Sequence, residues 1–217
     1  MTINPQLSFP LRGNWIALKP PGHHPFAIDF MKPCSKGKRF HKSNFLKYLL
    51  NGINVSQYYG WKEPIFSPVN GTIELVSDGY PDNEKTSLIS TIWIWFRATY
   101  LFKPDLTAKV IDIQPNAGNY IMIKSESGEI AFMAHMRSNS ILVEKGDIVK
   151  IGDKLGEIGN SGNTTAPHLH LNIFDQAEIL LKSKVLEFVF PQYEYCKNGN
   201  WVETTNDFPL KKQLIHF

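Results

Sequence analysis

The sequence is poor in cysteine, in net charge and in long apolar runs. Two cysteines, Cys34 and Cys196, lie far apart among 217 residues, so no CxxC metal motif exists and any metal site depends chiefly on His, Asp or Glu. The 23 basic and 20 acidic residues give a formal charge of +3, too small an excess to indicate a nucleic-acid partner. The most apolar stretch, Leu88 to Phe102, is shorter than a membrane span of about 20 residues and contains Arg97, so no membrane span is expected.

The first residues also lack the pattern of a secretory leader. Met1 to Leu18 shows no basic segment followed by an apolar run of roughly seven or more residues. We therefore expect no signal peptide and, by default, a cytoplasmic protein. Action outside the cell or at the cell envelope stays open, through another export route or through lysis.

The composition that is present, 42% hydrophobic and 20% charged, is typical of a globular protein. Short apolar runs alternate with turn signals along most of the chain, which favours strands over helices. No internal repeat, low-complexity tract or linker divides the sequence. We therefore predict one domain over residues 1–217.

Two regions indicate an antiparallel β architecture. Residues 119–124 and 130–136 read as the two strands of a hairpin around a turn at 125–128, and 72–76 reads as a strand launched by a Pro-Val-Asn-Gly turn. Residues 144–162 combine short apolar pieces with frequent glycines, as short strands and tight corners require. The expected fold is mainly β, an antiparallel β-sandwich or half-barrel with a few short helices in insertions.

Two segments can be helical. Asn44 to Asn51 is predicted as a short helix with Ser43 as N-cap and Gly52 as terminator. Its predicted buried stripe consists of Phe45, Leu46, Leu49 and Leu50. The stretch Leu88 to Phe102 fits either a helix or a pair of buried strands. It lies between strand regions and is interpreted as an insertion near a cleft, in which Trp93, Trp95 and Phe96 are candidates to line a substrate groove.

Histidines and one isolated acid are the residues that indicate chemistry. In His168 to Phe174 polar and apolar residues alternate, so His168, His170 and Asn172 share one face of a strand. Asp29 is the only acid between Met1 and Glu63 and lies in an apolar run, where a carboxylate is costly to bury unless it is paired or bound to a cation. With His23, His24 and His135, these residues offer His, Asp and His ligands for zinc, plus further imidazoles.

Several short motifs follow one another along the chain in a fixed order. They are Gly22-His23-His24, Phe26-Ala27-Ile28-Asp29-Phe30, Ser67-Pro68-Val69-Asn70-Gly71, Ala134-His135-Met136, residues 146–152, Gly159-Asn160-Ser161-Gly162 and Pro167-His168-Leu169-His170. This ordered set resembles the M23 metallopeptidases, the lysostaphin-like zinc endopeptidases. The resemblance covers a core of about residues 24–175, with an insertion at about 85–108, and it implies a barrel-sandwich hybrid of the duplicated hybrid motif type.

The resemblance implies one zinc ion per chain with His24, Asp29 and His170 as ligands, and it implies catalytic roles for His135 and His168. Many family members place three residues between the first His and the Asp, whereas four residues separate His24 from Asp29 and five separate His23 from Asp29. His24 has the spacing nearer to the family's and is therefore the expected ligand, and His23 is kept as the alternative.

The same resemblance implies the reaction. No HExxH motif supplies a glutamate base, so the expected activity is zinc-dependent hydrolysis of peptide bonds, assisted by histidines. The implied substrate is bacterial peptidoglycan, in its stem peptides or cross-bridges. The alternative is a non-catalytic M23-like binding or regulatory domain, which the intact set of histidines and Asp29 argues against.

Overall fold

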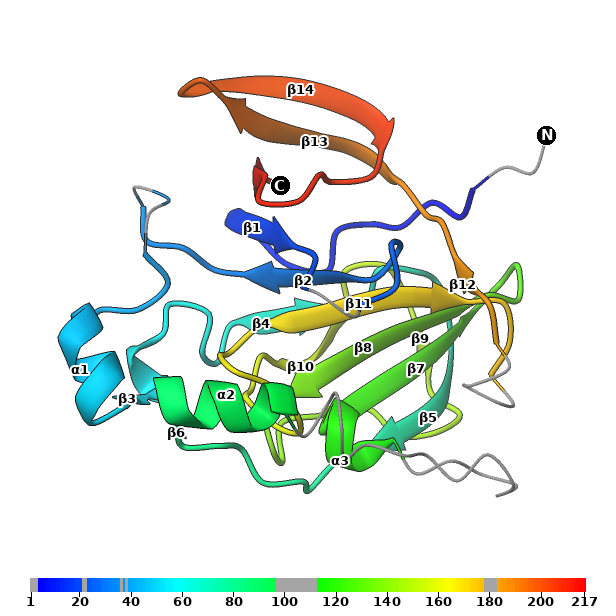
Figure 1. Cartoon of the computed structure of the whole chain (residues 1–217). Coiled ribbons are helices and arrows are strands. Elements are labelled where there is room, and N and C mark those ends of the chain that lie inside the picture. The colour runs from blue at the N-terminus through cyan, green and yellow to red at the C-terminus, as the bar shows by residue number, and fades with distance from the viewer. Residues whose placement is uncertain (1–3, 21–22, 36, 38, 97–112, 178–182) are drawn as a thin grey trace.

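An open antiparallel sheet of eleven strands forms the centre of the described fold (Figure 1). The computed structural model describes residues 4–20, 23–35, 37, 39–96, 113–177 and 183–217. The strands of the sheet are β1 (Asn14–Leu18), β2 (Ile28–Met31), β5 (Gly71–Ser77), β7 (Asn119–Ser125), β8 (Ile130–Met136), β9 (Ile148–Val149), β11 (Leu169–Phe174), β12 (Val185–Leu186), β13 (Phe190–Lys197), β14 (Asn200–Asp207) and β15 (Leu214–His216).

Ten of these strands follow one another in the order β14-β13-β15-β1-β2-β11-β8-β7-β5-β9, and β12 pairs with β11. All pairings within the sheet are antiparallel. The predicted mainly β, antiparallel fold is confirmed. Over the part of the chain that the structure describes, the sheet is not closed into a barrel, because β14 and β9 stand at its two ends.

Smaller elements surround the sheet. Two more pairs of strands are β4 (Pro64–Phe66) with β10 (Lys154–Glu157), and β3 (Ile53–Asn54) with β6 (Lys85–Thr86). The helices are α1 (Phe45–Leu50), α2 (Leu88–Phe96), α3 (Gln114–Ala117) and a 3-10 turn at Val55–Gln57. Of the described helices, none has the length and apolar character that crossing a membrane requires.

The main core packs against the strands at the middle of the sheet. Trp15 of β1, Phe30 of β2 and Leu171 of β11 are fully buried within it. The ring of Phe9 meets those of Phe30 and Phe190 edge to face, with centroids 4.9 Å and 5.2 Å apart. Burying a large apolar side chain contributes about 1.5 to 3 kcal/mol. The core therefore holds β2 and β11, the two strands that carry the candidate metal ligands, in a fixed register.

The predicted strands agree with the structure. β7 and β8 form the expected hairpin, in which Ile123 pairs with Ala131. Along β11 the apolar residues Leu169, Leu171 and Ile173 are buried in the main core. His170 and Asn172 alternate with them and lie on the other face, as the period of two in the sequence predicts.

The helix predictions are partly corrected. Asn44, and not Ser43, is the N-cap of α1, because its Oδ1 accepts a hydrogen bond from the backbone N–H of Lys47 at 2.9 Å. The predicted buried stripe is wrong at Leu46 and Leu50, which are 63% and 72% exposed, whereas Leu49 is half-buried and the side chain of Phe45 lies outside the described part of the structure. The reason is the place of α1, which packs beside α2 at the edge of the molecule and not over the sheet (Figure 1).

The apolar stretch that fitted either a helix or two strands is a helix over its described part. Helix α2 spans Leu88–Phe96, and residues 97–102 lie outside the described residues. Reciprocal hydrogen bonds between Ser87 and Ser90 fix its first turn: Ser90 Oγ accepts from Ser87 N–H at 2.7 Å, and Ser87 Oγ accepts from Ser90 N–H at 3.1 Å. The Tyr48 and Thr91 hydroxyls, 2.7 Å apart, tie α2 to α1.

Candidate metal centre and active-site cleft

Asp29 lies at the centre of the candidate site, on β2 and directly across from His170 of β11. Three imidazole nitrogens surround its buried carboxylate: His170 Nδ1 at 2.8 Å, His168 Nε2 at 3.5 Å and His23 Nε2 at 3.7 Å. Burial by itself would raise the pKa of Asp29. The histidines, His168 first, outweigh burial and hold the pKa of Asp29 well below its usual range. Asp29 is therefore ionised at every pH at which the site would work.

His170 is held at both of its ring nitrogens. Nε2 of His170 lies 3.0 Å from Asn172 Oδ1, and it donates to this oxygen when the imidazole carries its proton on Nε2. The other nitrogen, Nδ1, faces Asp29 Oδ1. A hydrogen bond at one imidazole nitrogen selects the tautomer and leaves the other nitrogen for a metal. Asn172 is 3% exposed, so this arrangement is protected from water.

His23, Asp29 and His170 form a group that fits a metal ion. One ligand atom from each residue lies within 4.8 Å of the other two. Two imidazole nitrogens and a carboxylate oxygen are a donor set that zinc accepts, and three protein ligands leave one coordination position open, as in catalytic zinc sites. The chemistry of these donors therefore fits the zinc ion that the sequence predicts.

The structure does not bring His24, the ligand expected from the resemblance, to Asp29. A turn starts at His24, whose carbonyl oxygen accepts a hydrogen bond from Ala27 N–H at 2.9 Å. Its ring stays over this turn, where Nδ1 accepts from Phe26 N–H at 3.3 Å, and the side chain is exposed. His23, the alternative, precedes the turn and is the residue that meets Asp29.

His168 lies beside the metal group on the same face of the sheet. The Ala166 carbonyl accepts a hydrogen bond from the Nδ1–H group of His168 at 2.7 Å, and the Thr164 hydroxyl is 3.0 Å from the same nitrogen. The other ring nitrogen, Nε2, points to Asp29. The ring is therefore fixed with Nε2 toward the carboxylate, although His168 itself is outside the group of three ligands.

His135 completes the cluster of side chains. Its ring centroid is 4.6 Å from that of His168, and its Nδ1–H group donates a hydrogen bond to the Ser161 carbonyl at 2.9 Å. Burial, and then the nearby charge of His168, lowers the pKa of His135 well below its ordinary value. His135 is therefore neutral near pH 7, and its Nε2 carries a lone pair that can accept a proton.

An irregularity in β8 explains how His135 reaches this face. By simple alternation His135 would follow Ala131 and Met133 into the core. The pairing of β7 with β8 shifts register next to His135, and the residue adopts a φ of 62°, which is rare for a side chain other than glycine. Such a bulge re-aims side chains beside active sites. Here Met136 takes the next core position and His135 turns toward His168.

A cleft of about 340 Å³ opens at these residues. His23, Asp29, His135 and His168 line it together with three residues of α2, namely Thr91, Ile92 and Ile94. Helix α2, the described part of the predicted insertion, thus lies at the cleft. Of the three aromatic residues predicted to line it, Trp93 and Phe96 stack on each other, with centroids 5.9 Å apart, and are not among the described lining residues. The side chain of Trp95 lies outside the described part of the structure.

The supporting residues were not assigned from sequence. Asn172 was placed on the correct face of its strand, but its hydrogen bond to His170 was not predicted. The alternation of polar and apolar residues along β11 could have indicated this hydrogen bond, because a polar residue two positions after a histidine in a strand lies on the same face as that histidine. The Ser161 and Ala166 carbonyls, which orient the two other imidazoles, carry no signal in the sequence because they are backbone groups.

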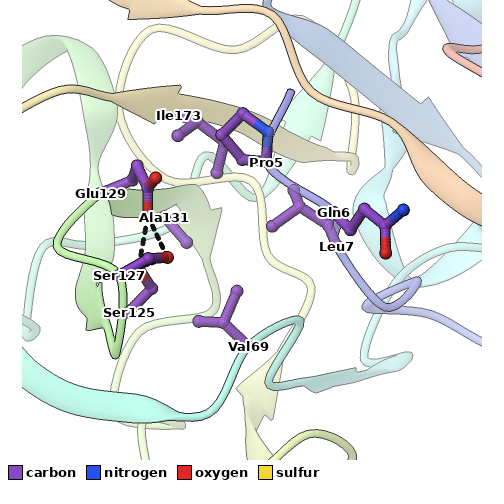
Figure 2. Close-up of a pocket in the computed structure, with 9 residues that line it drawn as sticks. All are labelled: Pro5, Gln6, Leu7, Val69, Ser125, Ser127, Glu129, Ala131 and Ile173. Atoms are coloured by element: carbon purple, nitrogen blue, oxygen red, sulfur yellow. Dashed lines mark hydrogen bonds between the residues drawn. The ribbon is translucent and has the colours of Figure 1, made fainter. Parts of the chain in front are cut away.

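A second, much smaller pocket lies where the N-terminal segment crosses β8 and β11 (Figure 2). Pro5, Leu7 and Ile173 supply apolar surface there. Its carboxylate, Glu129, accepts hydrogen bonds from the hydroxyls of Ser125 and Ser127. With a volume of about 60 Å³ and its one carboxylate already hydrogen-bonded, this pocket is not the candidate functional site.

Comparison with known proteins finds matching sequence in one family. Residues 106–180 match the profile of Peptidase family M23. An uncharacterized metalloprotease of Buchnera aphidicola is 41% identical over 64 residues, which are 30% of this chain and 16% of that protein. The peptidoglycan DD-endopeptidase ShyB of Vibrio cholerae is 38% identical over 64 residues, which are 30% of this chain and 15% of that protein. The matched segment is thus less than a fifth of the length of these curated relatives.

Comparison with solved structures gives partial matches. The antimicrobial peptidase lysostaphin from Staphylococcus simulans is 16% identical with a TM-score of 0.43, over 79% of this chain and 47% of that one. A zinc-containing peptidase from Vibrio cholerae is 20% identical with a TM-score of 0.43, over 78% of this chain and 37% of that one.

Proposed function

We propose that this chain, whose residues 106–180 match the profile of Peptidase family M23, is a zinc-dependent endopeptidase that hydrolyses peptide bonds of bacterial peptidoglycan. One observation carries the proposal: His23 and Asp29 form a three-ligand group with His170 of β11, and they also line one cleft with two further imidazoles, those of His135 and His168. The relatives described as peptidoglycan DD-endopeptidases support the substrate class.

We assign the metal to His23, Asp29 and His170. When bound, zinc supplies Lewis-acid activation of the peptide carbonyl and lowers the pKa of water at its open position. The ionised state of Asp29 and the Asn172-oriented ring of His170 prepare both ligands for a cation. His23 comes from the exposed end of the loop before β2, so it is the ligand with the least support from surrounding structure.

The two remaining histidines are proposed to move protons. His135 is kept neutral by burial, and its Nε2 is unoccupied by the hydrogen bond to Ser161, so it is suited to accept a proton from the attacking water. His168 holds Nε2 3.5 Å from Asp29 Oδ2, beside the metal group, so it is placed to pass a proton to the leaving amine. A residue in such a role changes the rate by roughly 10² to 10⁴-fold.

Purified peptidoglycan provides the test. Sacculi are incubated with the zinc-loaded parent, with the parent plus a chelator, and with Asp29→Ala as the matched control, and soluble products are identified by mass spectrometry. We expect the parent alone to release fragments with new amino termini in stem peptides or cross-bridges. If the parent holds zinc and binds sacculi yet releases nothing, the chain is the non-catalytic binding domain that the sequence left as the alternative.

A further inference from the structure

Helices α1 and α2 expose large apolar side chains to solvent. Of the thirteen exposed large apolar residues in the described part of the chain, seven belong to these two short helices. These seven form what we call the helix-pair surface, and they are 39% to 76% exposed: Leu46, Leu50, Leu88, Ile89, Ile92, Trp93 and Phe96. Large apolar side chains that gather in this way mark a contact with another protein or with a membrane. We infer that the helix-pair surface docks on a lipid bilayer that contains anionic lipids.

The two sides of α2 are reversed relative to an ordinary surface helix. With 3.6 residues per turn, the exposed residues of α2 all fall on one side of the helix, and every one of them is apolar. Ser90 and Thr91 fall on the other side and are half-buried, and the Thr91 hydroxyl lies 2.7 Å from that of Tyr48 in α1. A surface helix normally turns its apolar side to the core and its polar side to water. The apolar outer side of α2 is therefore not explained by packing within the described chain.

The extent of the helix-pair surface favours a membrane over a protein partner. Helices α1 and α2 lie side by side at the edge of the molecule (Figure 1). The nine residues of α2 span about 14 Å, and two adjacent helices are about 20 Å wide, so the surface measures roughly 280 Å². A stable protein complex buries about 800 Å² on each partner. A bilayer boundary takes up apolar side chains without a complementary shape, so this small surface is sufficient there.

The charges near the helix-pair surface select anionic lipids. Three lysines are exposed in or next to the two helices: Lys42 before α1, Lys47 within α1 and Lys85 before α2. Within four residues of either helix the sequence contains one acid, Glu84. Lysines beside an apolar surface attract anionic lipid headgroups, each contributing a similar increment to binding. A bilayer with anionic lipids is therefore expected to bind the chain more tightly than a neutral one.

Docking by this surface holds the cleft close to the bilayer. Thr91 and Ile94 line the cleft from α2, whereas the stacked rings of Trp93 and Phe96 do not line it. Aromatic rings of this kind collect at the boundary between lipid and water. One helix, about 10 Å in diameter, thus separates the cleft from the lipid headgroups.

The test measures sedimentation of the full chain with sucrose-loaded vesicles. One set of vesicles is phosphatidylcholine alone, and the other contains one quarter phosphatidylglycerol. We expect the parent to partition at least about 10-fold more strongly into the anionic vesicles, and high salt should reduce this binding. The double variant Ile89→Gln/Trp93→Gln should bind about 10-fold more weakly or less, because both side chains leave the bilayer boundary. Leu142→Gln/Ile148→Gln, at residues 62% and 82% exposed outside the two helices, is the matched control and should bind like the parent.

A second pair of variants tests the charge. Lys47→Gln should lower binding to the anionic vesicles by about 5-fold, whereas Lys150→Gln, at an exposed lysine next to β9, should leave it unchanged. Circular dichroism establishes that each variant is folded, and the comparison of the two vesicle types with the parent needs no variant. None of these measurements uses peptide hydrolysis, so failure of the proposed function leaves them unaffected.

Three results would overturn the inference. The first is a parent that binds neither vesicle, or binds both equally. The second is an equal effect of Ile89→Gln/Trp93→Gln and Leu142→Gln/Ile148→Gln. The third is a parent that is a dimer without lipid and becomes a monomer in Ile89→Gln/Trp93→Gln, because the helix-pair surface would then bind a second copy of the chain.

Discussion

Replacing Asn172 with alanine should weaken zinc binding without touching a ligand. In the tautomer that leaves Nδ1 free for a metal, His170 Nε2–H donates a buried hydrogen bond of 3.0 Å to Asn172 Oδ1, and this bond keeps Nδ1 directed to Asp29. Leaving a buried donor without its acceptor costs about 1 to 3 kcal/mol. If that cost falls on the metal-binding orientation of the ring, the affinity for zinc drops about 10- to 100-fold, the range found for lost supporting partners of metal ligands.

The assay is competition for zinc against a chelator of known affinity, with unfolding in excess chelator measured alongside to separate metal binding from stability. Asn172→Asp is the matched variant, because a carboxylate oxygen can accept the same hydrogen bond and should keep most of the affinity. The amide nitrogen of Asn172 is buried without a hydrogen-bond partner among the described residues, so its loss in either variant should be harmless. Unchanged zinc affinity in Asn172→Ala, or an equal loss in both variants, would refute the reasoning.

Three further predictions concern the histidines. His23→Ala should lose zinc while His24→Ala keeps it, because His23 Nε2 lies 3.7 Å from Asp29 and His24 packs on its own turn; metal analysis of both proteins decides, and the reverse result moves the ligand to His24. His168→Ala should keep zinc and lose roughly 10² to 10⁴-fold in peptidase rate, and parental activity in the zinc-loaded variant would remove it from the chemistry. In chelator, His135→Gly should be more stable than His135→Ala by roughly 1 kcal/mol in the free energy of unfolding, because glycine accepts the φ of 62° at no steric cost. Thermal unfolding of the two variants measures the difference, and equal stabilities would show that this backbone is unstrained.

The strand with His168 and His170 shows what a local pattern can predict. A period of two is a backbone property, so the sequence alone places both imidazoles and Asn172 on one face and three apolar residues in the core. Asp29 was likewise identified from its isolation in an apolar run, and the structure pairs it with imidazoles as burial demands. Both predictions needed only neighbouring residues.

His135 and His23 show why the rest could not be predicted. Alternation along β8 would send His135 into the core, and only a bulge with a left-handed residue turns it to the cleft. Nothing in Ala-His-Met marks that bulge, since such sites usually carry glycine. The choice between His23 and His24 depends on where the loop begins to turn, and adjacent identical residues give no signal for that.

Helix α1 shows the same limit for packing. Its spacing of leucines predicts a buried stripe, but burial depends on which element lies beside the helix, and α1 lies at the molecular edge with Leu46 and Leu50 exposed. The hydrophobic pattern of a single segment does not specify its neighbour.

The most direct test of the central claim is the zinc content of the purified chain, measured per protein molecule by mass spectrometry of the metal. The parent should hold one zinc ion, because His23, Asp29 and His170 are the only described residues that form a three-ligand group. His170→Ala should hold almost none while keeping the circular dichroism of a β-rich fold. A parent without zinc after growth in zinc-supplemented medium, or a His170→Ala protein with one zinc per chain, would contradict the account.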